Sequence, residues 1–204
     1  MPPMKSLAVA EMDGRDAYRL LISVVGPRPI AWVSTLGTDG TLNLAPFSFF
    51  NAVANRPLTV MVSIARRGEG PKDTLRNIQD TREFVLNLAD EALARQMNES
   101  SGEWPYDVDE FARAGLTTAA SVDVKPPRVA EAAVAMEARL SQVVPVEGTS
   151  YTIVLGHVLR FHIRDGLLRE NGLLDAMKAR PIGRLGGDEY ATVGSVFEMK
   201  RPVV

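Results

Sequence analysis

The chain of 204 residues has no cysteine and only two histidines, and each scarcity excludes a class of chemistry. Without cysteine there are no disulfides, thiolate nucleophiles, zinc ribbons or iron–sulfur ligands, and the sequence fits a reducing compartment, so we expect a cytoplasmic protein. No apolar run reaches the roughly 18 residues that a membrane-spanning helix needs, and residues 1–10 lack the apolar stretch of a signal peptide. The formal net charge of −2 disfavours nucleic acid or an acidic membrane as the main partner.

The two histidines, His157 and His162, fall within one predicted strand. Their separation of five residues predicts opposite faces of that strand, so we expect no shared metal ion and no metal site. His157 is a candidate contact for a bound ligand, although a structural or surface role explains it more simply. Three carboxylates at Asp107, Asp109 and Glu110 favour a solvated face and a helix N-terminus over a catalytic pair.

Apolar residues make up 46% of the chain, which is enough for the core of one domain spanning residues 1–204. Residues 46–56 and 66–71 are expected to be loops, and residues 98–128 a polar excursion that serves as a lid, an interface element or a mobile segment. Periodicity and turn residues predict helices at 16–24, 73–81, 90–97 and 109–114, and strands at 30–36, 41–45, 58–64, 83–88, 134–144 and 151–163.

Residues 134–144 carry conflicting signals. Their Ala, Glu and Met content favours a helix, whereas the alternation of Val134, Met136, Ala138 and Leu140 with polar and small residues favours a strand. We predict a strand here. The predominance of strands over helices then predicts a mostly β protein with peripheral helices, built as a mainly antiparallel β-barrel.

A Phe-rich segment follows the second predicted strand. It contains Pro46, Phe47, Ser48, Phe49 and Phe50. Alternate side chains of an extended segment point in opposite directions, so the three Phe side chains cannot all face one core. The segment therefore predicts either a flat ligand, with Ser48 and loop amides at its polar edge, or packing against core and a second subunit.

Cations and hydroxyls gather shortly afterwards, where a strand leads through a loop into a helix. Ser63 ends the strand, Arg66 and Arg67 lie in the loop, and Lys72 and Thr74 stand at the start of the helix, for which Asp73 is the predicted N-cap. A helix N-terminus with such neighbours is suited to a phosphate dianion, although solvated loop charges explain the same pattern. Residues 70–74 are not a nucleotide P-loop, because Pro71 removes an amide that the phosphate cradle needs.

Three segments in this order, residues 28–35, 43–50 and 72–78, together with the Asp39-Gly40 hairpin, resemble the flavin reductase-like family of FMN-binding split barrels. The resemblance implies a split β-barrel, usually a homodimer, with FMN (or FAD) held near the subunit interface. It also implies NAD(P)H as electron donor and an oxygenase as a possible partner. Hydride transfer to flavin needs no nucleophile or metal from the protein, so the resemblance implies no catalytic side chain.

Carried over to this sequence, the resemblance assigns residues to both ends of the flavin. Residues near the isoalloxazine and ribityl chain are Ser34, Thr35, Pro46, Phe47, Ser48 and Phe49. Residues near the phosphate are Ser63, Arg66, Lys72, Asp73 and Thr74. A Gly-rich segment at 180–190 adds Arg184 and Tyr190 as contacts for flavin or substrate, with a turn and a packing tyrosine as the alternative.

Three functions remain open from the sequence. The first is an NAD(P)H:FMN reductase, and the second is an FMN-binding electron-transfer or carrier protein that does not oxidise free NAD(P)H. The third has no flavin, and treats the Phe-rich segment as a dimer interface.

Overall fold

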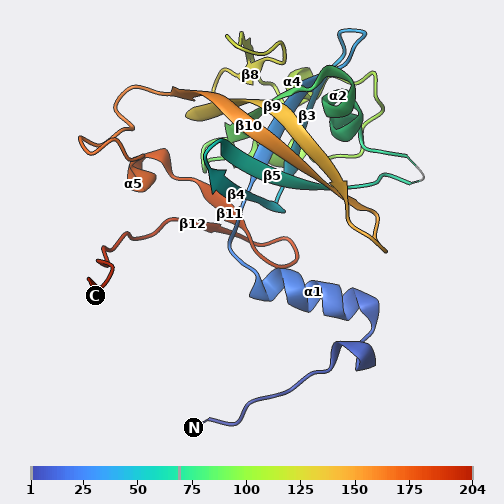
Figure 1. Cartoon of the computed structure of the whole chain (residues 1–204), viewed down its shortest axis with the longest axis vertical. Helices are drawn as coiled ribbons and strands as arrows, with labels where there is room; N and C mark the ends of the chain where they lie inside the picture. Colours follow the sequence, from blue (N-terminus) through green and yellow to red (C-terminus); the bar gives the residue numbers. More distant parts are fainter. Residues whose placement is uncertain (1, 69, 204) are drawn as a thin grey trace.

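Seven antiparallel strands form one sheet in the order β3-β2-β6-β9-β10-β5-β4, in a computed structural model that describes residues 2–68 and 70–203. The sheet curls into an open, split barrel with short helices around it (Figure 1). Its strands are β2 (Ala31–Leu36), β3 (Leu42–Phe47), β4 (Phe50–Asn55), β5 (Leu58–Ala65), β6 (Glu83–Leu88), β9 (Val134–Pro145) and β10 (Tyr151–Ile163). The predicted mainly antiparallel barrel, including the strand at 134–144, is thereby confirmed.

Smaller elements surround the barrel. One small sheet joins β1 (Arg28–Pro29), β11 (Ile182–Arg184) and β12 (Tyr190–Thr192), and a second joins β7 (Thr118–Ala119) and β8 (Arg128–Val129). The helices are the 3-10 turn η1 (Val9–Glu11), α1 (Gly14–Val24), α2 (Asp73–Thr81), α3 (Ala94–Glu99), α4 (Glu110–Arg113) and α5 (Ala176–Ala179). Helix α1 stands away from the barrel at the end where the chain begins (Figure 1), and none of its eleven residues is buried.

The barrel interior is filled by apolar side chains that alternate along the strands, as a half-buried sheet requires. Val33, Phe47, Ile64 and Phe84 are buried in this core. Gly156 of β10 lies against Phe84, and a Cβ added at Gly156 would stand 2.3 Å from Phe84 Cζ. The glycine therefore lets the β10 backbone approach the aromatic ring closely.

A second core lies outside the barrel wall and includes Trp32, Leu44, Met97 and Phe111. Trp32 is fully buried, and its indole Nε1 donates a hydrogen bond to Ser100 Oγ at 2.9 Å. Helices α3 and α4 supply Met97 and Phe111, so residues 98–128 begin by folding back over β2 and β3.

Three predicted elements differ in the structure. The predicted loop 46–56 contains strand β4, which pairs with β5 at the edge of the sheet. Its residues are mostly small or polar and exposed, so the sequence lacks the alternation that marks a half-buried strand. The helix expected at 90–97 is shifted to Ala94–Glu99, and α2 has Lys72 rather than Asp73 at its N-cap.

The two histidines share a face of β10, contrary to the expectation from their odd spacing. A β-bulge between Val158 and Arg160 adds one residue, so His157 lies opposite Arg139 and His162 opposite Ala135. These partners are four residues apart on β9, which separates the histidines by roughly 13 Å along the strand. That distance, not the face, keeps them from binding one ion.

Across residues 2–68 and 70–203, no helix has both the length and the apolar character that crossing a membrane requires.

Candidate flavin site

A small polar cavity lies where β3 approaches the start of α2. Its volume is about 40 Å³. Because α2 begins at Asp73, the free amides and the positive end of the helix dipole lie at this cavity. The lining residues are Asn43, Ala45, Pro46, Arg67, Lys72, Asp73, Thr74, Ser100, Ser101, Gly102, Glu103, Trp104 and Glu110. The cavity therefore combines cations, hydroxyls and a helix N-terminus, the groups that bind a phosphate.

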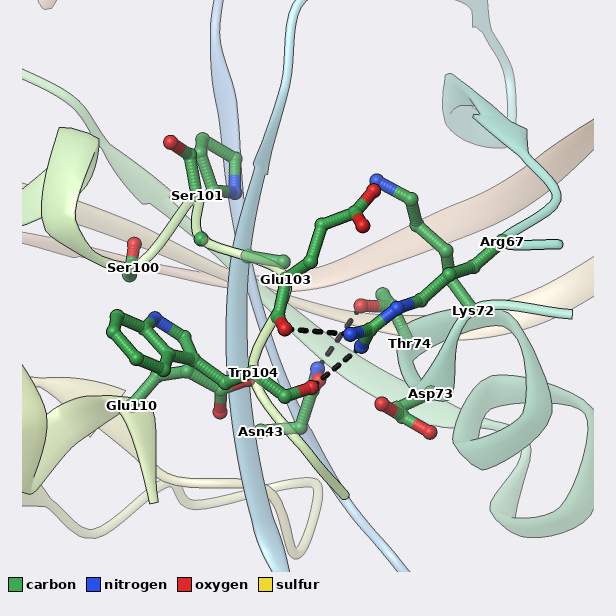
Figure 2. A pocket seen from close by; sticks show the side chains of 13 residues that line it. Asn43, Arg67, Lys72, Asp73, Thr74, Ser100, Ser101, Glu103, Trp104 and Glu110 are labelled. Carbon is green, nitrogen blue, oxygen red and sulfur yellow. Dashed lines mark hydrogen bonds between the residues drawn. The ribbon is translucent and has the colours of Figure 1, made fainter. Parts of the chain in front are cut away.

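Buried hydrogen bonds hold Thr74 in this cavity. Asn43 Nδ2 donates to Thr74 Oγ1 at 2.9 Å (Figure 2) and to Thr35 Oγ1 at 2.9 Å. Asn77 Nδ2 also donates to Thr35 Oγ1, at 3.1 Å. Thr35 was expected to touch the flavin, but it is fully buried beneath the site and orients Asn43 instead.

Glu110 is buried at the same cavity, so the expectation of a solvated carboxylate is wrong for this residue. Its Oε2 accepts a hydrogen bond from the amide of Leu44 at 3.1 Å. Burial raises the pKa of the Glu110 carboxyl to about 7. Asp109 does mark a helix N-terminus, because its side chain accepts hydrogen bonds from the amides of Phe111 and Ala112.

A larger aromatic cavity of about 320 Å³ adjoins the polar one, and the two share Pro46, Lys72 and Ser101. Its lining residues are Tyr18, Ile22, Arg28, Ile30, Pro46, Phe47, Ser48, Phe49, Lys72, Met97, Ser101, Arg184, Gly187 and Tyr190. Phe49 stacks on Tyr151 with ring centroids 5.6 Å apart, and Lys72 Nζ lies 5.7 Å from the centroid of Phe47. Aromatic rings beside several polar groups suit a flat ring that carries hydrogen-bonding atoms at its edge.

Arg28 lies at the edge of this cavity with one donor unused. Its guanidinium donates to the carbonyls of Ile22, Val25 and Leu185, which ties α1 to the segment after β11. Within the described part of the chain, Arg28 Nε is buried and has no hydrogen-bond partner. An unpaired buried donor beside a ligand-sized cavity is suited to an acceptor on a bound ring.

The structure brings most of the expected residues to one place. Those lining the two cavities are Pro46, Phe47, Ser48, Phe49, Lys72, Asp73, Thr74, Arg184 and Tyr190. The guanidinium of Arg184 packs 4.5 Å from the centroid of the Tyr190 ring and donates to its hydroxyl.

Five expected residues lie elsewhere, two of them inside the protein. Thr35 is the buried support of Asn43, and Ser34 is buried and donates to the carbonyl of Pro127 at 2.6 Å. Both faces of β2 are buried at this point, so a hydroxyl there need not face a ligand.

The other three line neither cavity. Ser63 lies within β5, and His157 pairs with Thr59 in the middle of the sheet. Arg66 is exposed, and its amide donates to the carbonyl of Ser150.

Sequence reasoning missed several groups that line the cavities. Tyr18 comes from α1 and Arg28 from β1, and Arg67 was noted only as part of the basic loop. Residues 100–104 gave no signal, because serine, glycine and glutamate in a polar stretch are typical of any loop. Arg28 is the one residue with a usable signal, since an arginine between two prolines ahead of a buried strand is unusual.

Comparisons with known proteins agree with this geometry. The model of the family "Flavin reductase like domain" matches residues 26–182. A protein of Aquifex aeolicus is 44% identical over 193 residues, covering 94% of this chain and 97% of its own. The crystal structure of nitrilotriacetate monooxygenase component B from Bacillus cereus is 35% identical with a TM-score of 0.93, covering 98% of this chain and 100% of its own. The structure of Pseudomonas fluorescens 2-nitrobenzoate 2-nitroreductase is 28% identical with a TM-score of 0.88, covering 97% and 96%.

Proposed function

Because this chain belongs to the flavin reductase-like family, we propose that it binds FMN and passes hydride from NAD(P)H to the bound flavin. The observation that carries this proposal is the junction of the two cavities. An aromatic cavity of about 320 Å³ shares Pro46, Lys72 and Ser101 with a polar one of about 40 Å³ at a helix N-terminus. That order of apolar and cationic surroundings matches a tricyclic ring joined to a phosphate.

The polar end fits a phosphate through Lys72 and Thr74. Lys72 lines both cavities, which supports a role for its ammonium group in binding the phosphate. Thr74 is oriented by Asn43, and its hydroxyl can donate to a phosphate oxygen while accepting from that amide. Asp73, the first residue of α2, pairs with Arg76 at 2.6 Å, which offsets its negative charge near the phosphate.

The aromatic end fits the ring through Pro46, Phe47 and Phe49, and Arg28 Nε supplies a donor for a ring acceptor. Flavin, when bound, accepts the hydride and carries the redox chemistry. The residues of this chain would bind the ring, orient it toward a nicotinamide and exclude water from one face. Arg184 and Tyr190, on the β11–β12 side of the cavity, are placed to contact the nicotinamide or another substrate.

We further propose a homodimer with the site near the interface. An apolar groove of about 660 Å³ lies between α1 and the segment that begins β4, and it is lined in part by Leu21, Val24 and Phe50. Phe49 lines both this groove and the aromatic cavity, so a second copy in the groove would adjoin the flavin. The cysteine-free sequence is consistent with a cytoplasmic reductase.

The similarity to a monooxygenase component supports a partner oxygenase that receives the reduced flavin. The alternative is an FMN-binding electron carrier that does not oxidise free NAD(P)H. Oxidation of NADH and NADPH at 340 nm with FMN present separates the two. Bound flavin that stays oxidised under an excess of both nicotinamides would favour the carrier.

Replacing Lys72 tests the phosphate end directly. Lys72→Ala should weaken FMN by about ten- to hundredfold, because a charge-assisted hydrogen bond contributes roughly 1.5–3 kcal/mol, and should affect riboflavin far less. Fluorescence quenching during titration measures both affinities, and Lys125→Ala, an exposed lysine outside both cavities, is the control. Equal losses for FMN and riboflavin would place Lys72 away from the phosphate, and no binding of either flavin to the wild type would end the proposed function.

A further inference from the structure

Residues 100–104 form one wall of the polar cavity, and core contacts hold them in place. Ser100 Oγ accepts from the buried indole of Trp32 at 2.9 Å and donates to the carbonyl of Met97 at 2.8 Å. Met97 is itself buried in the outer core. The start of this wall is therefore anchored in the protein interior rather than in solvent.

The end of the wall is fixed by Trp104. Its Nε1 donates to the carbonyl of Glu99 at 3.1 Å, and Arg113 lies 4.3 Å from the ring centroid. The indole packs against Gly102, where an added Cβ would stand 2.6 Å from Nε1. Only glycine leaves this space, so the segment is shaped to bring the Trp104 backbone to the cavity.

Arg67 joins the wall to the opposite side of the cavity. It comes from the loop between β5 and α2, and its guanidinium donates to the carbonyls of both Glu103 and Trp104 (Figure 2). Figure 2 shows the guanidinium extending from the Lys72 side of the cavity to these two carbonyl oxygens. Arg67, Glu103 and Trp104 all line the polar cavity, which has a volume of about 40 Å³ against about 320 Å³ for the aromatic cavity.

We infer that Arg67 is a specificity-determining residue, which closes the phosphate end so that the site accepts flavin mononucleotide and disfavours the dinucleotide FAD. This inference rests on the proposed function. Under the proposed function, the terminal phosphate of FMN would end inside the polar cavity. In FAD the same phosphate continues into a second phosphate and an adenosine, which need space that Arg67 and residues 103–104 occupy.

A different role for Arg67 would be a direct ion pair with the flavin phosphate. The two roles predict different results when the side chain is removed. Loss of an ion pair weakens FMN and FAD alike, because both carry a phosphate at that position. Loss of the closure increases the affinity for FAD relative to that for FMN, compared with the wild type. The ratio of the two dissociation constants therefore separates the roles.

The experiment measures dissociation constants of riboflavin, FMN and FAD by fluorescence quenching for the full-length wild type and for Arg67→Ala. For the wild type we expect FMN to bind at least about tenfold more tightly than FAD, the effect of leaving polar groups unpaired in a closed site. In Arg67→Ala that preference should fall to within about threefold. Arg66→Ala removes the same charge from the neighbouring exposed residue, so it measures the effect of charge alone and should keep the preference.

Each outcome bears on one proposal. Equal affinity of the wild type for FMN and FAD, or an unchanged preference in Arg67→Ala, would overturn the role of Arg67 and leave the proposed function standing. Failure of the wild type to bind any of the three flavins would instead overturn the proposed function. A circular-dichroism melting curve shows whether Arg67→Ala is folded. If it is not, Arg67→Lys, which retains the charge but cannot donate in a fork to two carbonyls, makes the same test.

Discussion

At the scale of single residues, the site carries a carboxyl group whose environment opposes its charge. Glu110 is buried, and its pKa is raised to about 7 from an ordinary 4.5. Between these values the folded protein keeps a proton that the unfolded chain has lost, so the free energy of unfolding falls as pH rises through this window. The loss is complete above pH 7.

In Glu110→Gln the side chain does not titrate, so the free energy of unfolding of this variant should not show the decrease with pH that Glu110 causes in the wild type. The wild type should lose about 3 kcal/mol relative to this variant between pH 4.5 and pH 8, at about 1.4 kcal/mol for each pKa unit. Glutamine keeps an oxygen that can accept from the Leu44 amide. Urea unfolding of both proteins at pH 5 and pH 8 measures the difference, and parallel pH profiles would show that Glu110 titrates normally.

The sequence predicted the residues that line the two cavities best where a motif supplied several of them together. Pro46 to Phe49 and Lys72 to Thr74 all line the cavities. Ser34 and Thr35 show the limit of this reasoning. They are neighbours on a strand, so they face opposite sides of the sheet, and both sides of β2 are covered here. Which face meets the ligand depends on packing that adjacent residues do not reveal.

At the scale of elements, a buried carboxylate is one of the groups that attach the segment at 121–127 to the barrel. Glu137 of β9 is fully buried and accepts hydrogen bonds from the amides of Val122 at 2.7 Å and Val124 at 3.1 Å. It also accepts from the Asp123 amide and contacts His162 Nε2. Burial by itself would raise the pKa of Glu137, but the hydrogen bonds from His162 and from these amides lower it.

Glu137→Gln should destabilise the fold by about 2–4 kcal/mol at pH 7, because several buried donors lose a charged acceptor. A lowered carboxyl pKa adds stability above the unfolded value near 4.5 and loses it below. The difference in the free energy of unfolding between wild type and Glu137→Gln should therefore be smaller at pH 3.5 than at pH 7. Urea unfolding at the two pH values measures it. Asp123→Asn, which breaks only the exposed pair with Arg160 at 2.7 Å, is the control and should cost less than about 1 kcal/mol.

Most elements were predictable because their residues alternate or repeat over a long span. The strands at 83–88 and 151–163 have the expected bounds. Strand β4 was missed because its side chains do not alternate between apolar and polar. It is a strand because its backbone pairs with β5. The bulge at Leu159 was equally invisible, and one added residue reversed the predicted faces of the histidines.

At the scale of the whole molecule, helix α1 leaves apolar side chains exposed in a single chain. An eleven-residue helix is marginal by itself in water, and α1 leaves Leu21 56% and Val24 71% exposed. A second copy that covers the groove beside α1 would bury both side chains. The spacing of apolar residues predicted this helix, but nothing in the sequence showed that its apolar side would lie free of the barrel.

Leu21→Glu should convert a dimer into a monomer, because it places a charge in the apolar groove. Light scattering coupled to size exclusion measures the mass in solution. Leu173→Glu, which changes a leucine that is 61% exposed in another part of the chain, should leave the mass unchanged. A monomeric wild type, or a dimer that survives Leu21→Glu, would reject this interface. A monomer that still binds FMN with full affinity would show that the site is complete within one chain.

The close contact between Gly156 and Phe84 affects packing beyond these two residues. Any larger residue at Gly156 would displace the Phe84 ring, which is fully buried and would stand 2.3 Å from the added Cβ. Phe47 shares the interior with Phe84 and also forms part of the aromatic cavity. A side chain at position 156 would therefore disturb the core that supports Phe47, one wall of the aromatic cavity.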